Sequence, residues 1–421
     1  MGSLHYSFLV FLAILVSSAN AQNGLHLPVR KDPKTLQHYT TFQMGSNRAD
    51  INTVIDLGAE HLWFACDDYT SNSYSPIPCW SSKCELAKGS GCIVECHRSD
   101  PRPGCTNNTC GSSNFNPFEE FLSGEGYYED TLYTKDNVQV PQFIFSCASN
   151  DFLQGLASGT VGMLGLARTQ ISLHKQVTGK LNLADKFSLC LPSSGLGKLS
   201  IGDVSSSSKS DISSFLKSTA LIINPNSTSP VHGEGDAAVE YFIDVKSIRV
   251  NGETLSVKDS YFSFDKNGNG GTKISTIQNY TALHPTIYKP FTRAFVKAAS
   301  DMKIKSVAAV APFRACFSSS SISKTSAGPA VPAIDLVLPG NTDAYWRING
   351  ANSMVEIDQK TTCLGFVEGE QRPKPATAWP TTSIVIGSHQ LEENLLVFDL
   401  VSSQLHFTSS LLAHGKSCSR V

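Results

Sequence analysis

The chain has 421 residues, of which 41% are hydrophobic, so it is long enough to bury a large core and to form two or three domains. Lys and Arg total 34 against 36 Asp and Glu, which gives a formal net charge of -2 at pH 7. A nearly neutral chain has no overall electrostatic attraction for nucleic acid or for an anionic membrane. The composition therefore predicts a globular protein whose partners are selected by local sites.

The first 21 residues predict a signal peptide. They contain no Lys, Arg, Asp or Glu, they carry the apolar run FLVFLAILV at 8–16, and they end in the A-x-A triplet at 19–21. A membrane anchor, the alternative, needs an apolar run of about 20 residues. We therefore expect the mature chain to begin near Gln22 and to be secreted, with no membrane association.

The first motif of the mature chain is TVIDLGAEHLWFAC at 53–66, which places Asp56 after two apolar residues and before Leu57 and Gly58. Seven of the twelve cysteines lie from residue 66 to residue 110. An even number of cysteines in a secreted chain predicts disulfides, and we interpret 66–110 as a cross-linked insert. A zinc site that uses His97 is the less favoured alternative, because the compartment is oxidising. The disulfide candidates are Cys66, Cys79, Cys84, Cys92, Cys96, Cys105, Cys110, Cys147, Cys190, Cys316, Cys363 and Cys418.

The rest of the chain consists mostly of short runs rich in Val, Ile, Phe and Thr, separated by Gly, Ser, Asn and Pro, which predicts a mostly β protein. We expect a helix at 284–300, where Pro285 suits a first helical position and Pro290 makes the start uncertain, and a shorter helix after Ser172. Asn251 and the glycine that follows it predict a hairpin turn.

Two other local signals concern sites. The sequons at Asn107, Asn226 and Asn279 are candidates for N-linked glycosylation where they are exposed. The run DKNGNG at 265–270 matches half of an EF-hand loop, but position twelve is Thr276 and not the required Glu, so it is interpreted as a turn. We expect no metal and no cofactor.

A weak internal repeat suggests two domains of similar plan. Asp56 is followed about 110 residues later by VGMLGLA around Gly165, and Ser275 is followed at a similar distance by SIVIGSH around Gly387. The Ser- and Lys-rich stretch at 205–218 is the expected boundary. The predicted organisation is a signal peptide at 1–21, a first lobe at 22–218 and a second lobe at 219–421.

Four ordered segments resemble those of plant pepsin-like aspartic proteases: the Asp56 loop, GTVGMLGLARTQISL at 159–173, GGTKISTIQNYTALHPTIYKPF at 270–291, and SIVIGSHQLEENLLVFDL at 383–400. The chain looks still more like a secreted plant subgroup that includes extracellular dermal glycoprotein, basic 7S globulin, and inhibitors of xylanase and xyloglucan-specific endoglucanase. The resemblance covers essentially the whole mature chain. It implies a bilobal pepsin-like fold with a cleft between two β lobes.

The resemblance also implies that catalysis is lost. Peptide hydrolysis by this fold needs two carboxylates that share one proton. Asp56 matches the first of them, but Ser275 stands at the position of the second, Leu57 replaces a hydroxyl residue, and Ile277 replaces a glycine. No G-x-S-x-G, H-E-x-x-H or phosphate-binding loop is present as an alternative. We expect Asp56 and Ser275 to be vestiges of the site in a chain that is not an enzyme.

The function that the resemblance favours is inhibition of a microbial cell-wall-degrading glycoside hydrolase, an endoglucanase or a xylanase, in the apoplast or cell wall as part of plant defence. The candidate inhibitory loops are 318–332 and 368–382, with Lys324, Arg372 and Lys374 as candidate anchors. Inhibitors of this kind carry Arg where this chain has Ser326 and Thr381. The alternatives are an extracellular binding or storage-type glycoprotein that holds a peptide or cell-wall ligand and, less favoured, an active aspartic endopeptidase. The oligomeric state stays open.

The resemblance implies three long-range disulfides. These are Cys66 with Cys147, Cys190 with Cys418, and Cys316 with Cys363. The other six cysteines are expected to pair with one another between residues 79 and 110.

Overall fold

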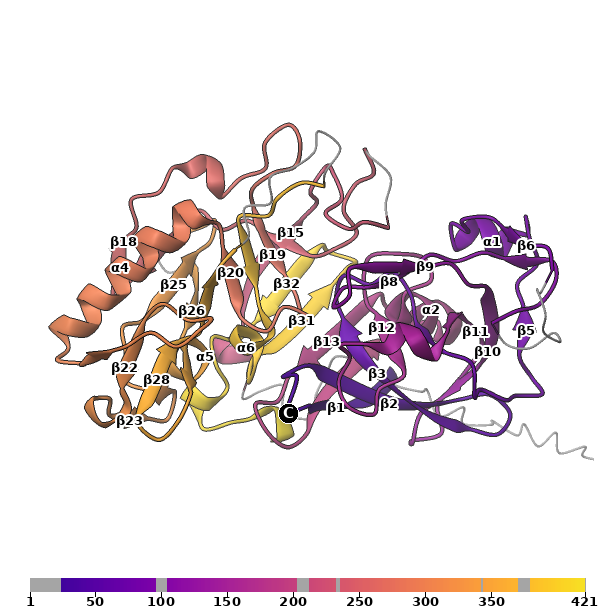
Figure 1. The fold of residues 1–421 in the computed structure, drawn as a ribbon, viewed down its shortest axis with the longest axis horizontal. Coiled ribbons are helices and arrows are strands. Elements are labelled where there is room, and N and C mark those ends of the chain that lie inside the picture. Colours follow the sequence, from indigo (N-terminus) through magenta and orange to yellow (C-terminus); the bar gives the residue numbers. More distant parts are fainter. Residues whose placement is uncertain are drawn as a thin grey trace, which may run out of the picture.

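The computed structural model describes residues 24–95, 104–202, 212–231, 235–341, 344–369 and 379–420. The chain forms two β-rich lobes side by side, with the first half on the right of Figure 1 and the second half on the left. The mostly β, two-lobed class predicted from the sequence is confirmed. Within the described residues, no helix is both long and apolar enough to cross a membrane.

The strands of the first lobe are β1 Gly24–Lys31, β2 His38–Met44, β3 Ala49–Asp56, β4 Trp63–Ala65, β5 Ser75–Pro76, β6 Cys92–Ile93, β7 Thr109–Cys110, β8 Asn114–Asn116, β9 Phe121–Ser123, β10 Tyr127–Tyr133, β11 Gln139–Ala148, β12 Gly162–Gly165, β13 Lys186–Cys190 and β14 Gly197–Gly202. Its helices are α1 Ser82–Leu86 and α2 Leu173–Leu181. The short helix predicted after Ser172 is α2, for which Ser172 is the N-cap.

The strands of the second lobe are β15 Lys217–Ile222, β16 Phe242–Ile243, β17 Ser247–Val250, β18 Glu253–Thr254, β19 Thr272–Ile274, β20 Thr281–Leu283, β21 Ser306–Val307, β22 Cys316–Ser318, β23 Lys324–Thr325, β24 Gly328–Pro329, β25 Ile334–Val337, β26 Tyr345–Ile348, β27 Met354–Glu356, β28 Thr361–Leu364, β29 Phe366–Glu368, β30 Ile384–Ile386, β31 Leu395–Asp399 and β32 Gln404–Phe407. Its helices are α4 Pro285–Asp301, α5 Gly350–Ser353 and α6 Ser388–Leu391. The helix predicted at 284–300 is α4, which His284 caps and which continues through Pro290.

The two lobes repeat one arrangement of strands. In the first lobe β3 runs parallel to β12, β12 antiparallel to β4, and β4 parallel to β11. In the second lobe β19, β30, β20 and β29 pair in the same order and with the same directions. The internal repeat read from the sequence is therefore a structural repeat.

A six-stranded antiparallel sheet joins the lobes, in the order β1, β14, β13, β31, β32 and β15. At the central pairing of β13 with β31, the rings of Phe187 and Phe398 stack with centroids 4.6 Å apart. Aromatic stacking and apolar burial across this pairing stabilise the contact between the lobes. Residues 205–211 of the expected boundary lie outside the described residues.

Disulfides connect segments that are far apart in the sequence. The pairs Cys66–Cys147, Cys190–Cys418 and Cys316–Cys363 form as the resemblance implies. In the insert, Cys79 pairs with Cys92 and Cys84 with Cys110. Cys105 is also disulfide-bonded, and Cys96 lies outside the described residues, as does His97 of the zinc alternative.

Candidate functional site

Asp56 is the last residue of β3 and lines a small pocket together with residues of both lobes. Its carboxylate is only 6% exposed and accepts a 2.7 Å hydrogen bond from the N–H of Gly58. β3 and β12 pair in parallel with Asp56 opposite Gly165. A side chain at Gly165 would lie 2.5 Å or less from backbone atoms of the loop after Asp56. The glycine is therefore required for β12 to brace this loop.

Ser275 occupies the equivalent place in the second lobe, directly after β19. Its N–H donates to the carbonyl oxygen of Ile386, and the next residue, Gly387, lies against the backbone of 278–281 as Gly165 lies against the Asp56 loop. The hydroxyl of Ser275 accepts a 3.2 Å hydrogen bond from the N–H of Gln278. The two halves thus bring equivalent positions to one site, but only one of these positions carries a carboxylate.

Thr276 links the two halves of the site. Its hydroxyl donates to the carbonyl oxygen of Ile55 over 2.7 Å and accepts from the N–H of Leu57 over 3.1 Å. Because the hydroxyl of Thr276 is buried, both bonds form away from competing water. Leu57 is the equivalent residue of the first lobe, but it has no hydroxyl and cannot make the corresponding hydrogen bonds to the second lobe. Only Thr276 therefore makes these bonds between the lobes.

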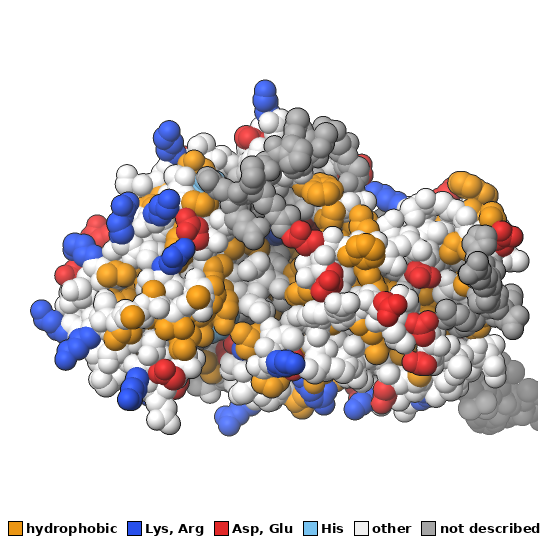
Figure 2. All heavy atoms as spheres, in the orientation of Figure 1, with side chains coloured by type: hydrophobic (Ala, Val, Ile, Leu, Met, Phe, Trp, Pro, Cys, Tyr) orange, Lys and Arg blue, Asp and Glu red, His pale blue; other side chains and the backbone are white. Residues whose placement is uncertain are grey.

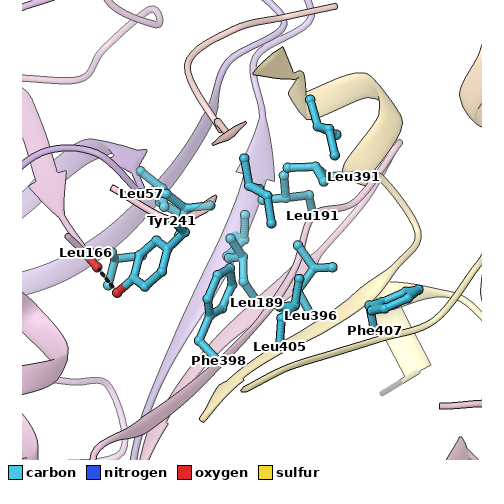
Figure 3. Close-up of a cluster of buried hydrophobic side chains, with 14 of the residues drawn as sticks. Leu57, Leu166, Leu189, Leu191, Tyr241, Leu391, Leu396, Phe398, Leu405 and Phe407 are labelled. Carbon is cyan, nitrogen blue, oxygen red and sulfur yellow. Dashed lines mark hydrogen bonds between the residues drawn. The ribbon is translucent and has the colours of Figure 1, made fainter. Parts of the chain in front are cut away.

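The side chain of Leu57 has an apolar role instead. It is 0% exposed and belongs to the main hydrophobic core. Figure 3 shows it beside Tyr241, whose hydroxyl donates to the carbonyl oxygen of Leu166. Leucine at position 57 therefore adds apolar packing next to the Asp56 loop.

Burial controls the electrostatics of Asp56. It raises the pKa of the carboxyl group to about 6, and the negative charge of Glu240 acts in the same direction. The hydrogen bond from Gly58 and the positive charge of Lys273 oppose this effect. Glu240 is itself buried, accepts a hydrogen bond from Thr228, and lies 3.6 Å from the ammonium group of Lys273.

Glu240 and Lys273 were not identified from the sequence. Lys273 lies in the GGTKISTI segment, two residues before Ser275, but a single lysine in a strand gives no signal of a buried ion pair. Glu240 lies 184 residues from Asp56 in the chain. The two acidic groups meet only because the segment before β16 enters the space between the lobes.

The space beside Asp56 is a small pocket. Trp63 and Phe115 of the first lobe and Ser229 and Val231 of the second line it together with Asp56. The buried indole N–H of Trp63 has no hydrogen-bond partner within the described chain. One carboxylate without a second cannot share a proton in the manner of the catalytic pair.

The predicted inhibitory loops lie at different places. Lys324 is exposed on the short hairpin of β23 and β24, where the hydroxyl of Thr325 donates to the carbonyl oxygen of Gly328. Ser326 is exposed at the same turn. Figure 1 shows β23 at the lower end of the second lobe, well below β20.

Arg372 and Lys374 lie outside the described residues. The ends of their segment are placed: the N–H of Gly369 donates to the carbonyl oxygen of Leu283, and the carbonyl oxygen of Thr381 accepts from the N–H of Gly270. Both ends are thus anchored near the end of β20 and the start of β19, away from β23 in Figure 1. The described ends of this segment therefore lie apart from the β23–β24 hairpin.

The sequons differ in their surroundings. Asn107 is exposed and Asn226 is half-buried. The side-chain NH2 of Asn279 donates a 2.9 Å hydrogen bond to the carbonyl oxygen of Thr35, and its amide oxygen is buried. Of the three, Asn107 has the most accessible amide.

The segment 265–270 forms a turn. The carboxylate of Asp265 accepts hydrogen bonds from the N–H groups of Asn267 and Asn269, so it closes its own turn, as interpreted from the sequence. Within the described ranges, no group of three or more His, Cys, Asp or Glu side chains is arranged to hold a metal ion.

Comparison with known proteins gives a consistent picture. A family model described as the xylanase inhibitor N-terminal domain matches residues 38–203, and one described as the xylanase inhibitor C-terminal domain matches 240–409. A protein from Nicotiana benthamiana named probable aspartic proteinase GIP2 is 40% identical over 435 residues, covering 98% of this chain and 96% of that protein.

Solved structures agree with these matches. The crystal structure of a protein named edgp is 41% identical, with a TM-score of 0.87, and the match covers 94% of this chain and 97% of that one. An aspartic proteinase from Irpex lacteus is only 12% identical, with a TM-score of 0.58, and covers 94% of this chain and 99% of its own. The latter likeness concerns the fold alone. The predicted pepsin-like fold is therefore confirmed.

Proposed function

Because this chain belongs to the family of xylanase-inhibitor-type aspartic protease homologues, we propose that it is a secreted, catalytically inactive protein that inhibits a microbial cell-wall-degrading glycoside hydrolase. The target is an endoglucanase or a xylanase, and the site of action is the apoplast or cell wall, where such inhibition serves plant defence. The proposal has two parts, loss of peptidase activity and binding of a glycosidase, and each rests on its own observation.

The loss of peptidase activity rests on the single carboxylate. Ser275 lies at the position related to Asp56 by the repeat of the lobes, and a hydroxyl group cannot hold the second charge or share the proton. Glu240 is the other acid near Asp56, but it is held by Thr228 and Lys273. Both contacts involve Oε1, and Oε2 is buried without a hydrogen-bond partner among the described residues. Glu240 does not, however, lie at the position that the repeat relates to Asp56, so it does not replace the missing acid.

Binding of a glycosidase requires an exposed group that can enter a foreign cleft. Glycoside hydrolases place two carboxylates on either side of the scissile bond, and a cationic side chain can form charge-assisted hydrogen bonds with them. A short, closed hairpin on a rigid β scaffold presents such a side chain at low entropic cost. Lys324 on the β23–β24 hairpin meets this description.

Arg372 is the alternative anchor, with Lys374 beside it. A guanidinium group can address two carboxylate oxygens at once, which an ammonium group cannot do. Since β23 lies apart from the anchored ends of 369–381, the two segments are separate candidates for contact with one enzyme cleft. Single variants in each segment can therefore show which of the two segments inhibits the enzyme.

The test is titration of the purified protein against panels of xyloglucanases and xylanases. The variants are Lys324→Ala and Arg372→Ala, with Asp56→Ala as the cleft control. Losing a desolvated anchor costs about 2 to 4 kcal/mol, or roughly thirty-fold to a thousand-fold in affinity. The proposal is wrong if no enzyme of the panels is inhibited, or if both loop variants inhibit fully while Asp56→Ala does not.

A further inference from the structure

Although the net charge of the chain is close to zero, the second lobe carries a cluster of exposed cationic side chains. Its members are exposed side chains of α4 and of the chain that follows it, and we call them the α4 basic face: Lys289, Arg293, Lys297, Lys303, Lys305 and Arg314. Figure 2 shows Lys and Arg gathered over the left-hand lobe, which contains α4, and Asp and Glu more numerous over the right-hand lobe. On the face drawn, positive charge is thus concentrated over the lobe that contains α4.

Helix geometry holds part of this face in a row. Lys289, Arg293 and Lys297 are four residues apart and therefore lie on one side of α4, with a rise of about 6 Å from each to the next. The opposite side of the helix buries residues such as Phe291 and Phe295 in the core. That packing fixes the direction in which the cations point.

The cations are poorly compensated. Lys297 pairs with Asp301 at 3.1 Å, and both side chains are exposed. In the part of the chain that the structure describes, no carboxylate forms an ion pair with the other five, although Glu368 lines the same groove as Lys289 and Arg314. Like charges four residues apart destabilise a helix, and α4 carries two such pairs in succession. An anionic ligand would relieve this repulsion.

We propose that the α4 basic face binds an acidic polysaccharide, a polymer that carries carboxylate groups at short, regular intervals. A row of fixed cations suits a linear polyanion better than a flat lipid surface, since every charge of the row can meet the same chain. The five disulfides among the described residues are typical of an oxidising compartment outside the cytosol, where nucleic acid is not the usual polyanion. This binding would hold the protein on an extracellular matrix, and it does not depend on the inhibitory role.

The test measures binding of the full-length mature protein to polygalacturonate, with dextran as the neutral polymer. The variant combines Lys289→Ser, Arg293→Ser and Lys297→Ser. The matched control removes three exposed cations of the first lobe, by Lys34→Ser, Lys135→Ser and Lys180→Ser. We expect the α4 variant to bind at least about tenfold more weakly, the control to bind within about twofold of the wild type, and binding by the wild type to weaken steeply as salt increases.

Three results would overturn the proposal: no binding of the wild type to polygalacturonate at low salt, an equal loss in the first-lobe control, or equally tight binding to vesicles that contain phosphatidylserine. If the helix variant does not fold, Arg314→Ser removes a cation outside the helix that lines the same groove as Lys289. Retention of full affinity by that second variant would also count against the α4 basic face.

Discussion

The backbone N–H of Leu57 donates a hydrogen bond to the hydroxyl oxygen of Thr276, 3.1 Å away, although the two residues are 219 positions apart in the chain. The same hydroxyl donates to the carbonyl oxygen of Ile55. One buried side chain of the second lobe thus satisfies two backbone groups of the first. The loop around Asp56 is therefore a point of hydrogen-bonded contact between the two lobes.

Replacing Thr276 by Val should destabilise the protein. The substitution keeps the shape of the side chain but leaves the N–H of Leu57 and the carbonyl oxygen of Ile55 buried without a partner, which costs about 1 to 3 kcal/mol each. Equilibrium denaturation with guanidinium should show a lower midpoint. Thr325→Val is the matched control, because Thr325 is exposed and its change should cost about 0.5 kcal/mol or less. Equal effects of the two substitutions would contradict this contact between the lobes.

The raised pKa of Asp56 predicts how stability depends on pH. In the unfolded chain the carboxyl group titrates near 3.8, and in the native state it titrates at about 6. Between these values the native state binds more protons, so the contribution of Asp56 to stability decreases as pH rises.

Relative to Asp56→Asn, the wild type should lose on the order of 2 to 3 kcal/mol as pH rises from about 4 to about 6.5. The measurement is the free energy of unfolding of both proteins at several pH values in this range. Asparagine keeps an oxygen that can accept the hydrogen bond from the N–H of Gly58, but its side chain does not titrate in this pH range. Parallel curves would show that the pKa is not raised.

Restoring one acid should not restore peptidase activity. Ser275→Asp supplies a second carboxylate, but Leu57 still lacks the hydroxyl, and Ile277 packs against the hydrophobic cluster that contains Trp63. We expect neither the wild type nor the variant to cleave a denatured protein substrate at acid pH. Cleavage that pepstatin blocks, in either protein, would be the contrary result.

Glycosylation should follow the accessibility of the side-chain nitrogen. Asn107 is exposed and should carry a glycan, whereas the nitrogen of Asn279 donates to the carbonyl oxygen of Thr35 and should not be modified. Glycopeptide mapping of protein from a plant host measures both sites in one sample. A glycan on Asn279 in the folded protein would mean that this hydrogen bond does not form before glycosylation.

Much of the local structure could be predicted from the sequence because it depends on neighbouring residues. The hairpin between β17 and β18 turns at Asn251 and Gly252, both with positive φ, as that dipeptide predicts. The course of α4 followed from its apolar spacing, although Pro290 left its start open. Pro290 is the sixth residue of α4, beyond the N–H groups at the helix start that have no intrahelical partner, so it removes one intrahelical hydrogen bond. The helix nevertheless continues through it, with Phe291 and Phe295 buried in the core.

The candidate site was only partly predictable. Asp56 and Ser275 were identified through the resemblance to pepsin-like proteases, and the similar spacing from each to Gly165 and Gly387 agreed with it. Glu240 gave no such signal, since its role depends on the path of the segment before β16. The same limit applies to the candidate inhibitory loops. Their side chains can be identified in the sequence, but the distance between β23 and the described ends of the other loop, Gly369 and Thr381, cannot.

The sequence by itself determined the two-lobed β fold, the repeat of its halves, and the absence of a second carboxylate at position 275. These features depend on residue type and on spacing along the chain. Only the tertiary structure decided that Thr276 fastens the lobes, that Glu240 lies beside Asp56, and that the cations of α4 form one face. The physical reason is that hydrogen bonds, burial and charge–charge interactions act over a few ångströms in space. Residues about 200 positions apart acquire those interactions only when the lobes have packed together.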